Sequence, residues 1–307
     1  MHATIETCGN RRYVRAAWLP VVLLLVDGCG QYTTYDGSLP GGNPIEGLRE
    51  VERLQHHGLA GPVQQYTSRT VDGSYIVVDY DAWSEDPEAL HLLDDYQATL
   101  ATVLPTALEN HAERLAYWIN GYNAGVIRGV LDHYNGDHGY RVIEGGFFDE
   151  ARYTFGGVQL SLNHVEQGVV RGDFQHDSMI SVTGDVRDMI TLWHEDLWDG
   201  DVVDARVHAA LNCAALGCPN LLATAPFVYR ADVLEEQLET ATRQWLDHPG
   251  KGAGPQGISQ LFEWYVEDFA ADAGSVEDFI AAHRSGGLLG VDVTQIIPYD
   301  WTLNIAE

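Results

Sequence analysis

Leu115-Ala-Tyr-Trp-Ile-Asn-Gly-Tyr-Asn-Ala-Gly-Val-Ile-Arg-Gly-Val-Leu131 is the stretch that decides the fold. At the 100° per residue of an α-helix, its apolar side chains cover an unusually wide arc. The polar side that remains carries Arg114, Arg128 and Asp132. A helix that is apolar around most of its circumference has to be covered by other elements. We therefore expect a central, mostly buried helix over about residues 107–134.

The segments before this helix predict a strand and a second helix. Residues 73–80 are rich in β-branched and aromatic side chains, as strands are. Asp86 and Pro87 are typical of a helix start, and Pro105 ends the helix predicted over residues 84–104.

The segments after the central helix are more varied. A pair of glycines predicts the turn of a hairpin over residues 153–162, and Ser161 or Asn163 can cap a short helix that follows. Residues 172–204 show only irregular periodicity. Helices are predicted over residues 231–246, 258–269 and 275–283, with a flexible link at 250–257. The predicted fold class is α+β: a single helix-dominated domain at residues 49–307, with a few short strands around the central buried helix.

The first 28 residues have the order of a lipoprotein signal peptide. Three arginines precede an apolar run at residues 16–26, which is too short to span a bilayer. Gly28 before Cys29 resembles the box in which a cysteine becomes the lipidated first residue of the mature protein. Ordinary signal cleavage nearby is the alternative. We expect an exported protein that its lipid holds in the cell envelope, at the outer membrane or the periplasmic face.

The charge of the chain limits its partners. Residues 29–48, rich in Gly, Pro and small polar side chains, predict a flexible tether. The chain has 45 acidic and 17 basic residues, a net charge of −28, and Lys251 is its only lysine. A negative net charge of this size repels nucleic acid and anionic membrane surfaces and favours cationic partners. A genome-wide composition bias is an alternative origin of the acidic composition. We expect an envelope protein or a small-molecule ligand as partner, no nucleic acid, and membrane contact only through the lipid.

Two asparagines in the central helix are candidate binding residues. Asn123 lies inside the apolar arc and Asn120 at its edge, so both amides need hydrogen-bond partners. They either tie down the backbone of neighbouring loops or point into a pocket, where an amide can bind substrate or stabilise an oxyanion.

Glu166 is a polar group beside the apolar face of the short helix that ends near residue 171. It can form a buried ion pair, for which Arg171 and Arg206 are the candidate partners. It can also serve as a general acid or base if its surroundings raise its pKa.

The segment 206–219 contains two cysteines and a histidine. His208 and Asn212 are four residues apart and share one face of a helix or a strand, whereas Cys213 lies about 140° from His208 on a helix. A nucleophilic Cys213 would therefore need a base from elsewhere in the fold, for example His164. Two cysteines and one histidine offer three metal ligands at best, so we expect neither a metal nor another cofactor.

Cys213 and Cys218 have three possible states: a disulfide, two packed free thiols, or a pair that contains a reactive thiol. Oxidising compartments favour the disulfide. In a continuous helix the two Cα atoms would be about 8.6 Å apart, beyond the roughly 7 Å that a disulfide allows. A bridge therefore needs a bend, and the residues from Gly217 to Pro219 are the expected place for it.

Five blocks of the chain resemble the family known as domain of unknown function 547. The blocks are residues 117–124, 165–171, 206–219, 234–238 and 299–304. The resemblance runs in order from about residue 65 to residue 304. It implies a bacterial member of a kind that is often exported or lipid-anchored, and it implies no established activity. The chain departs from the family pattern at Gln167, where a histidine is usual, and an amide cannot act as a base near neutral pH.

Two hypotheses of function follow. In the first, the protein is a membrane-anchored envelope lipoprotein whose domain binds or organises a partner, and the polar residues form a structural network. In the second, it is a thiol-dependent hydrolase or acyl transferase with Cys213 as nucleophile, a histidine as base, and Asn212 or Asn120 as orienting group. Gln167 and the competing disulfide favour the first.

Overall fold

The computed structural model describes residues 5–8, 11–14, 24–26, 32–34 and 56–306. The first four ranges are the strands β1 (Ile5–Cys8), β2 (Arg11–Val14), β3 (Leu24–Val26) and β4 (Tyr32–Thr34), which pair antiparallel as β1–β2 and β3–β4. Cys29 and most of the predicted signal peptide and tether lie outside the described residues. In the part of the chain that is described, no helix is long and apolar enough to cross a membrane.

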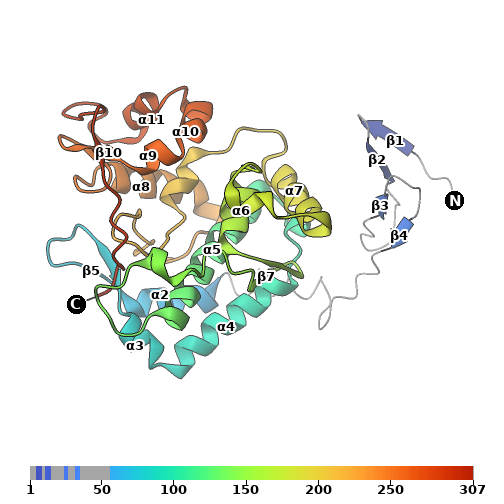
Figure 1. The fold of residues 1–307 in the computed structure, drawn as a ribbon, viewed down its shortest axis with the longest axis horizontal. Helices are drawn as coiled ribbons and strands as arrows, with labels where there is room; N and C mark the ends of the chain where they lie inside the picture. The colour runs from blue at the N-terminus through green and yellow to red at the C-terminus, as the bar shows by residue number, and fades with distance from the viewer. Residues whose placement is uncertain (1–4, 9–10, 15–23, 27–31, 35–55, 307) are drawn as a thin grey trace.

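The predicted central helix is confirmed as α5 (His111–His133), which runs through the middle of the domain (Figure 1). The side chain of Asn110 caps it by accepting the N–H of Glu113 at 3.0 Å. Every residue from Leu115 to Ile127 is buried. Three glycines spaced by four residues make this possible, because they leave room for large neighbours on one face. A Cβ at Gly121 would lie 2.7 Å from the Phe155 ring, and one at Gly125 would lie 2.6 Å from Leu162.

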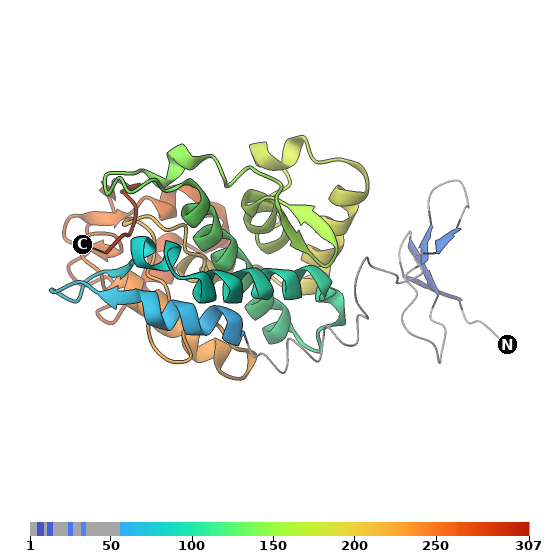
Figure 2. The same cartoon turned by 90° about the horizontal axis from the view of Figure 1, so that it is seen from below.

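The N-terminal layer consists of helices and one small sheet. Its elements are α2 (His57–Tyr66), β5 (Thr67–Arg69), β6 (Ile76–Val78), α3 (Tyr80–Ser84), α4 (Pro87–Thr102) and η1 (Pro105–Ala107). Figure 2 shows α2 and α4 side by side along one edge of the domain. The predicted helix is confirmed as α4, with Asp86 as its cap. The predicted strand is confined to β6, because Tyr80 already begins a helix.

The middle of the chain covers another side of α5. Its elements are η2 (Val142–Gly145), β7 (Tyr153–Phe155), β8 (Val158–Leu160), the π-helix η3 (His164–Val170), α6 (Asp177–Ile180) and α7 (Gly184–Trp198). The hairpin prediction is confirmed by β7 and β8. The interpretation of residues 172–204 as irregular was wrong, because α7 fills half of them. Only four side chains of α7 are buried, so its apolar stripe is too narrow to stand out in the sequence.

The C-terminal third forms the end of the molecule at the upper left of Figure 1. Its elements are η4 (Ala205–Ala209), η5 (Ala231–Val233), α8 (Leu234–Leu246), β9 (Ala253–Gly254), β10 (Gly257–Ser259), α9 (Leu261–Trp264), α10 (Val266–Ala273), α11 (Val276–His283) and β11 (Ile296–Ile297). The helix predicted over residues 258–269 was wrong, because this segment is divided among β10, α9 and α10. The predicted link at 250–257 contains β9, whose partner is β10.

Two apolar cores lie side by side in the domain. The larger surrounds α5, and a smaller one is built from aromatic rings of the C-terminal third, among them Trp245, Phe262 and Phe279. The last residues of the chain return to the larger core. Asn304 accepts the N–H of Val78 at 2.8 Å and donates its own backbone N–H to Ala214 at 2.8 Å. The C-terminal segment thus connects β6 with the turn that carries the cysteines.

Candidate functional site

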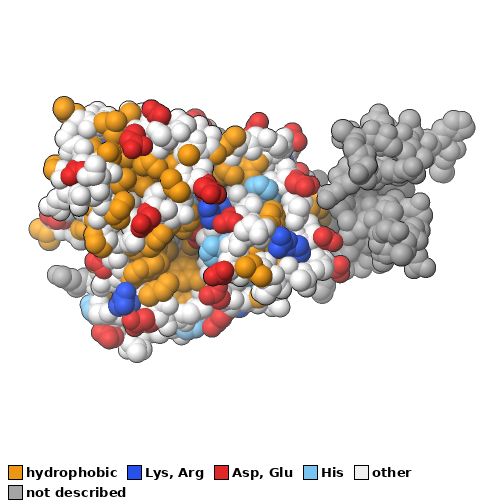
Figure 3. Space-filling model, turned by 45° about the horizontal axis from the view of Figure 1, so that its top comes forward, with side chains coloured by type: hydrophobic (Ala, Val, Ile, Leu, Met, Phe, Trp, Pro, Cys, Tyr) orange, Lys and Arg blue, Asp and Glu red, His pale blue; other side chains and the backbone are white. Residues whose placement is uncertain are grey.

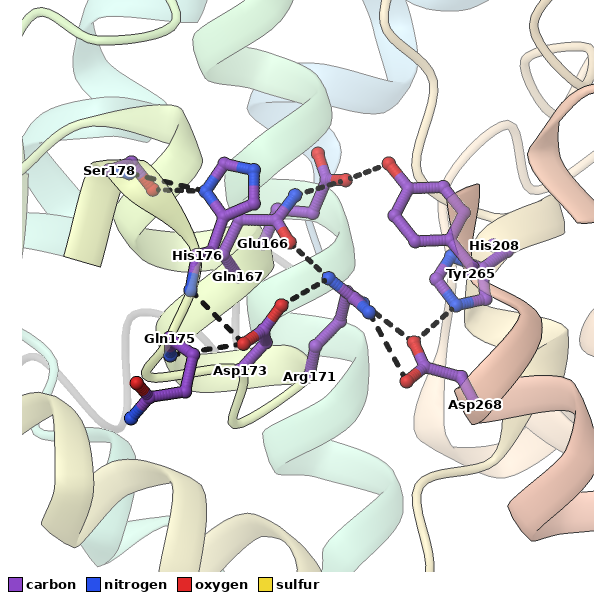
Figure 4. Close-up of polar contacts among 10 residues, drawn as sticks. All are labelled: Glu166, Gln167, Arg171, Asp173, Gln175, His176, Ser178, His208, Tyr265 and Asp268. Atoms are coloured by element: carbon purple, nitrogen blue, oxygen red, sulfur yellow. Dashed lines mark hydrogen bonds and ion pairs between the residues drawn. The ribbon is translucent and has the colours of Figure 1, made fainter. Parts of the chain in front are cut away.

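The carboxylate of Glu166 is held by two tyrosines. The side chain of Glu166, on the π-helix η3, accepts hydrogen bonds at 2.7 Å from the hydroxyls of Tyr122 on α5 and Tyr265, the residue between α9 and α10. The amide of Gln167 donates to the same carboxylate at 3.0 Å. Figure 4 shows Gln167 and Tyr265 converging on it. Three donors therefore satisfy Glu166, and one of them is the amide of Gln167.

Arg171 links Gln167, which donates to Glu166, with a second carboxylate, Asp268 on α10. Its guanidinium donates to both oxygens of Asp268, at 2.6 and 3.3 Å, and also to the side-chain oxygen of Gln167. It lies over the ring of Tyr265, 4.6 Å from the centroid. His208 makes a hydrogen bond to Asp268 at 2.9 Å and stacks on Tyr265 at 4.2 Å between ring centroids. We call these residues, Glu166, Gln167, Arg171, His208, Tyr265 and Asp268, the polar network (Figure 4).

The charges of the polar network stabilise one another. Burial alone would raise the pKa of Asp268, but hydrogen bonds from His208 and Arg171 hold that pKa below its ordinary value. Burial opposes the charge of Arg171, yet Asp268 keeps the pKa of Arg171 above its usual range. Burial and then the charge of Glu166 raise the pKa of Tyr265 well above 10. Arg171 and Asp268 therefore remain charged near neutral pH, and Tyr265 remains a donor.

Cys213 and Cys218 lie on the loop that follows η4, and both are free thiols. The disulfide considered from the sequence is thus not present in this structure, although the two residues are in contact. The backbone N–H of Cys213 donates to Sγ of Cys218 at 3.1 Å, and Sγ of Cys213 lies 2.7 Å from the hydroxyl of Tyr299. Cys213 is half-buried, whereas Cys218 is 3 % exposed.

The bend that brings these thiols together begins earlier than the sequence suggested. Ala214 has a φ of 63°, in the left-handed region, and the N–H of Cys218 donates to the carbonyl of Ala215 at 3.0 Å. Gly217 has an ordinary φ and serves a different purpose. A Cβ at this position would lie 2.6 Å from the backbone nitrogen of Asp300, so only glycine lets the returning C-terminal segment pack here.

All three candidate asparagines hold loop backbone in place. Asn120 donates to the carbonyl of Tyr229 at 2.7 Å and accepts its N–H at 2.9 Å. Asn123 donates to the carbonyl of Ala210 at 3.0 Å and accepts the N–H of Asn212 at 2.8 Å. Asn212 in turn donates to a carbonyl of the cysteine loop and accepts an N–H from it. Asn123 and Asn212 therefore fix the segment that carries His208 and Cys213, whereas Asn120 fixes the backbone at Tyr229.

The four candidate catalytic residues do not form one cluster. The sulfur of Cys213 contacts Tyr299, whereas His208 contacts Asp268, and no hydrogen bond joins Cys213 to His208, Glu166 or His164 within residues 56–306. His164 faces Ser161, whose N–H approaches its ring at 3.3 Å, and burial lowers the pKa of His164. The same residues contain no group of three His, Cys, Asp or Glu side chains that could hold a metal ion.

The sequence interpretation missed four residues that complete these contacts. Tyr265 and Asp268 come from a segment predicted as one helix, and Tyr299 comes from the C-terminal segment. Lys251 comes from the predicted flexible link, yet it is only 4 % exposed. The sequence contained one signal for Lys251, which is that the chain has no other lysine.

An aromatic surface adjoins the cysteine loop. The rings of Trp264, Tyr299 and Trp301 pack against one another, with centroids 5.1 Å apart for Trp264 and Tyr299 and 4.6 Å apart for Tyr299 and Trp301. Trp264 is 41 % exposed, and no hydrogen bond involves its indole N–H or that of Trp301 among the described residues. We call these three side chains the aromatic surface. Figure 3 shows one face of the domain, on which hydrophobic side chains gather in a hollowed area with carboxylates around it.

A comparison with protein families matches residues 105–246 to the family described as "Protein of unknown function, DUF547". This segment of the chain belongs to the DUF547 family. The DUF547 match covers α5, η3 and the cysteine loop, whereas Tyr265, Asp268 and Tyr299 lie beyond its end. No curated protein and no solved structure matches the chain.

Proposed function

We propose that this DUF547 protein is a non-catalytic binding domain, exported and anchored in the cell envelope by a lipid on Cys29, whose aromatic surface binds a basic segment of another envelope protein. One observation carries the proposal: the three candidate partners of Cys213, namely His208, Glu166 and His164, form their hydrogen bonds with other residues. Among the described residues no histidine or carboxylate hydrogen-bonds to the Cys213 sulfur, whose partners are Tyr299 and Cys218. Thiol catalysis of hydrolysis or acyl transfer needs such a base or a lowered pKa.

The electrostatics of Cys213 support the same conclusion. Its hydrogen bond with Cys218, and then its burial, raise the pKa of the Cys213 thiol well above 9. The thiolate is the nucleophile, so a thiol with a raised pKa is poorly reactive at neutral pH. Glu166 already accepts three hydrogen bonds from protein groups, so its carboxylate is not free to act as a base.

Charge complementarity indicates the partner. Residues 252–306 contain eight carboxylates and one arginine, Arg284, and the whole chain has a net charge of −28. Exposed indole and phenol rings attract ammonium and guanidinium groups through their electron-rich faces. The aromatic surface in an acidic surrounding therefore fits lysine or arginine side chains, and it disfavours anionic ligands and nucleic acid.

The membrane anchor is supported by the N-terminal sequence. A basic segment, a short apolar run and Gly28-Cys29 follow in the order that lipidation requires. Replacing Cys29 with Ser should move the protein from the membrane fraction to the soluble fraction. Unchanged membrane association of this variant would contradict the lipid anchor.

Binding is tested by titrating the purified protein with a hexa-arginine peptide and with a hexa-serine peptide, followed by tryptophan fluorescence. We expect saturable binding of the first only, weakened by salt. The double change Trp264→Ala and Trp301→Ala should weaken it about tenfold or more, in line with about 1–2 kcal/mol for a cation over a ring. Leu92→Ala, at a 38 % exposed position on α4, is the matched control. Equal affinity of the double variant and the control would overturn the proposed surface.

The half-buried position of Cys213 is what favours the second candidate function, a thiol-dependent hydrolase or acyl transferase. Iodoacetamide labelling of the reduced protein between pH 5 and 10 separates the two. The binding domain predicts that labelling of Cys213 is slow at neutral pH and accelerates only in alkaline solution. Rapid labelling of Cys213 near pH 6 would favour the enzyme.

A further inference from the structure

The two thiols of the cysteine loop share one small environment. Besides the N–H contact at 3.1 Å, Sγ of Cys218 lies 3.6 Å from the carbonyl of Leu211, and Cys213 contacts Tyr299 at 2.7 Å. Hydrogen bonds to both sulfurs contribute, after burial, to the raised pKa of Tyr299. The left-handed Ala214 has already removed the helical separation that would keep residues five apart from bridging.

Lys251 supplies a positive charge next to this pair. Its ammonium donates to the carbonyl of Cys218 at 2.6 Å and to the side-chain oxygen of Asn220 at 2.7 Å, and it lies over the ring of Tyr75. No carboxylate pairs with it within residues 56–306. A buried ammonium without a carboxylate is costly unless another anion lies near. The thiols are the groups that can become that anion.

The titration of the pair follows from these contacts. Burial opposes a Cys218 thiolate, but hydrogen bonds from Cys213 and Tyr299, and the charge of Lys251, lower the pKa of Cys218 below 9. Burial lowers the pKa of Lys251 to about 8, while the charges of the two cysteines act in the opposite direction. Cys218 is thus the first thiol to lose its proton, and Cys213 is the more accessible one.

We propose that Cys213 and Cys218 are a reversible redox pair, which thiol–disulfide exchange with a small-molecule or protein disulfide converts to an intramolecular disulfide. The proton of Cys213 moves to the Cys218 thiolate, and the Cys213 sulfur attacks one sulfur of the incoming disulfide, RSSR. A Cys213–SR mixed disulfide forms, and the leaving RS⁻ takes the proton back from Cys218, so that RSH departs and Cys218 is again a thiolate. The Cys218 thiolate then attacks the Cys213 sulfur, the Cys213–SR bond breaks, and the second RS⁻ leaves as RSH with the proton that Cys218 first released to solvent. Two protein thiols lose two electrons and two protons in total, which the oxidant RSSR gains as two RSH.

The roles of the two cysteines differ in this scheme. Cys213 forms the mixed disulfide because it is only half-buried, so that the incoming disulfide can reach its sulfur. The buried Cys218 then attacks Cys213 and closes the intramolecular disulfide. Lys251 is a positioning residue, which favours the thiolate of Cys218 and holds its loop through the Cys218 carbonyl. Formation of the disulfide removes the Cys218 thiolate beside Lys251 and the Cys213 thiol that contacts Tyr299. The oxidation state of the cysteines therefore changes a contact of Tyr299, which belongs to the aromatic surface.

The test uses the purified full-length protein in glutathione buffers of rising ratio of oxidised to reduced glutathione. After acid quenching and alkylation, trypsin releases residues 207–230 as one peptide, because Arg206 and Arg230 are the nearest cleavage sites on either side of both cysteines. We expect a reversible shift from the doubly alkylated peptide to one lighter than the dithiol by two hydrogens, about 2 Da. A doubly alkylated peptide at every ratio, or a stable glutathione adduct on Cys213, would overturn the redox pair.

Variants separate the roles. Cys218→Ser should accumulate the glutathione adduct on Cys213, and Cys213→Ser should remain unmodified. Lys251→Met should shift the pH profile of the exchange rate to higher pH, and Lys251→Arg should restore it. An unchanged profile in Lys251→Met, with far-UV circular dichroism like that of the parent, would remove Lys251 from the scheme. Failure of these results leaves the binding proposal standing, because that proposal is tested at Trp264 and Trp301.

Discussion

The polar network and the cysteine loop are neighbours that treat buried charge in opposite ways. In the polar network, Arg171 has Asp268 as its counter-charge, and Asp268 has His208 as a second partner. In the cysteine loop, Lys251 has backbone and amide oxygens but no carboxylate partner among the described residues. The charges of the first region are paired within it, whereas the groups of the second region that could become an anion beside Lys251 are the two thiols. The ion pair of Arg171 and Asp268 does not change with redox conditions. The surroundings of Lys251 do change when the neighbouring thiols are oxidised.

The largest expected effect is that of Arg171→Met. Removing one member of a buried ion pair leaves Asp268 without its counter-charge, since the Arg171 side chain is 7 % exposed. The free energy of unfolding, measured with urea, should fall by about 3–5 kcal/mol. Arg230→Met is the matched control, because the Arg230–Asp232 pair is exposed and should contribute less than about 1 kcal/mol. Equal losses in both variants would mean that the polar network is not a closed unit.

An intermediate effect is expected from Glu166→Gln. An amide has one acceptor oxygen, so it cannot satisfy Tyr122, Tyr265 and Gln167 together. The free energy of unfolding should fall by about 1.5–3 kcal/mol, as for a hydrogen bond to a charged group. Tyr265→Phe removes one of these donors but keeps the ring on His208, so it should cost about 1 kcal/mol. A larger loss in Tyr265→Phe than in Glu166→Gln would contradict this account.

The smallest effect is expected from Lys251→Met. The change removes two hydrogen bonds but also a buried charge, so at pH 7 the free energy of unfolding should change by about 1 kcal/mol or less. The folded-state pKa of Lys251, about 8, lies below its ordinary value of 10.5. The unfolded chain therefore binds more protons between these values, and the parent should gain stability relative to Lys251→Met as pH rises from 8 to 10.5. A loss as large as that of Arg171→Met would mean that the two regions do not differ.

The sequence predicted those parts of the fold in which one segment carries its own signal. The central helix, α4 and the hairpin of β7 and β8 have wide apolar arcs, a capping Asp-Pro pair or a glycine turn, and all three are confirmed. The helix α7 was missed because its buried stripe is narrow. The segment 258–269 was misread because its apolar residues serve a strand and two short helices, which periodicity cannot distinguish from one longer helix.

The site was predictable only in part, for a related reason. A buried ion pair with Arg171 or Arg206 is one of the two roles that the sequence indicates for Glu166, whereas Arg171 pairs with Asp268, 97 residues away. The amides of Asn120 and Asn123 bind loop backbone, which is one of the two roles that their burial indicated. The role of Tyr299 depends on the return of the C-terminal segment against Gly217, a contact between distant segments that no local pattern encodes.

The burial of Lys251 has a practical consequence for studying local opening. A lysine-specific endoprotease can cut this chain only after Lys251. In the folded protein this residue lies between the end of α8 and the start of β9, and its side chain is buried. Each cut would therefore count one excursion of this segment out of the domain. The chain contains its own single-site reporter of local unfolding.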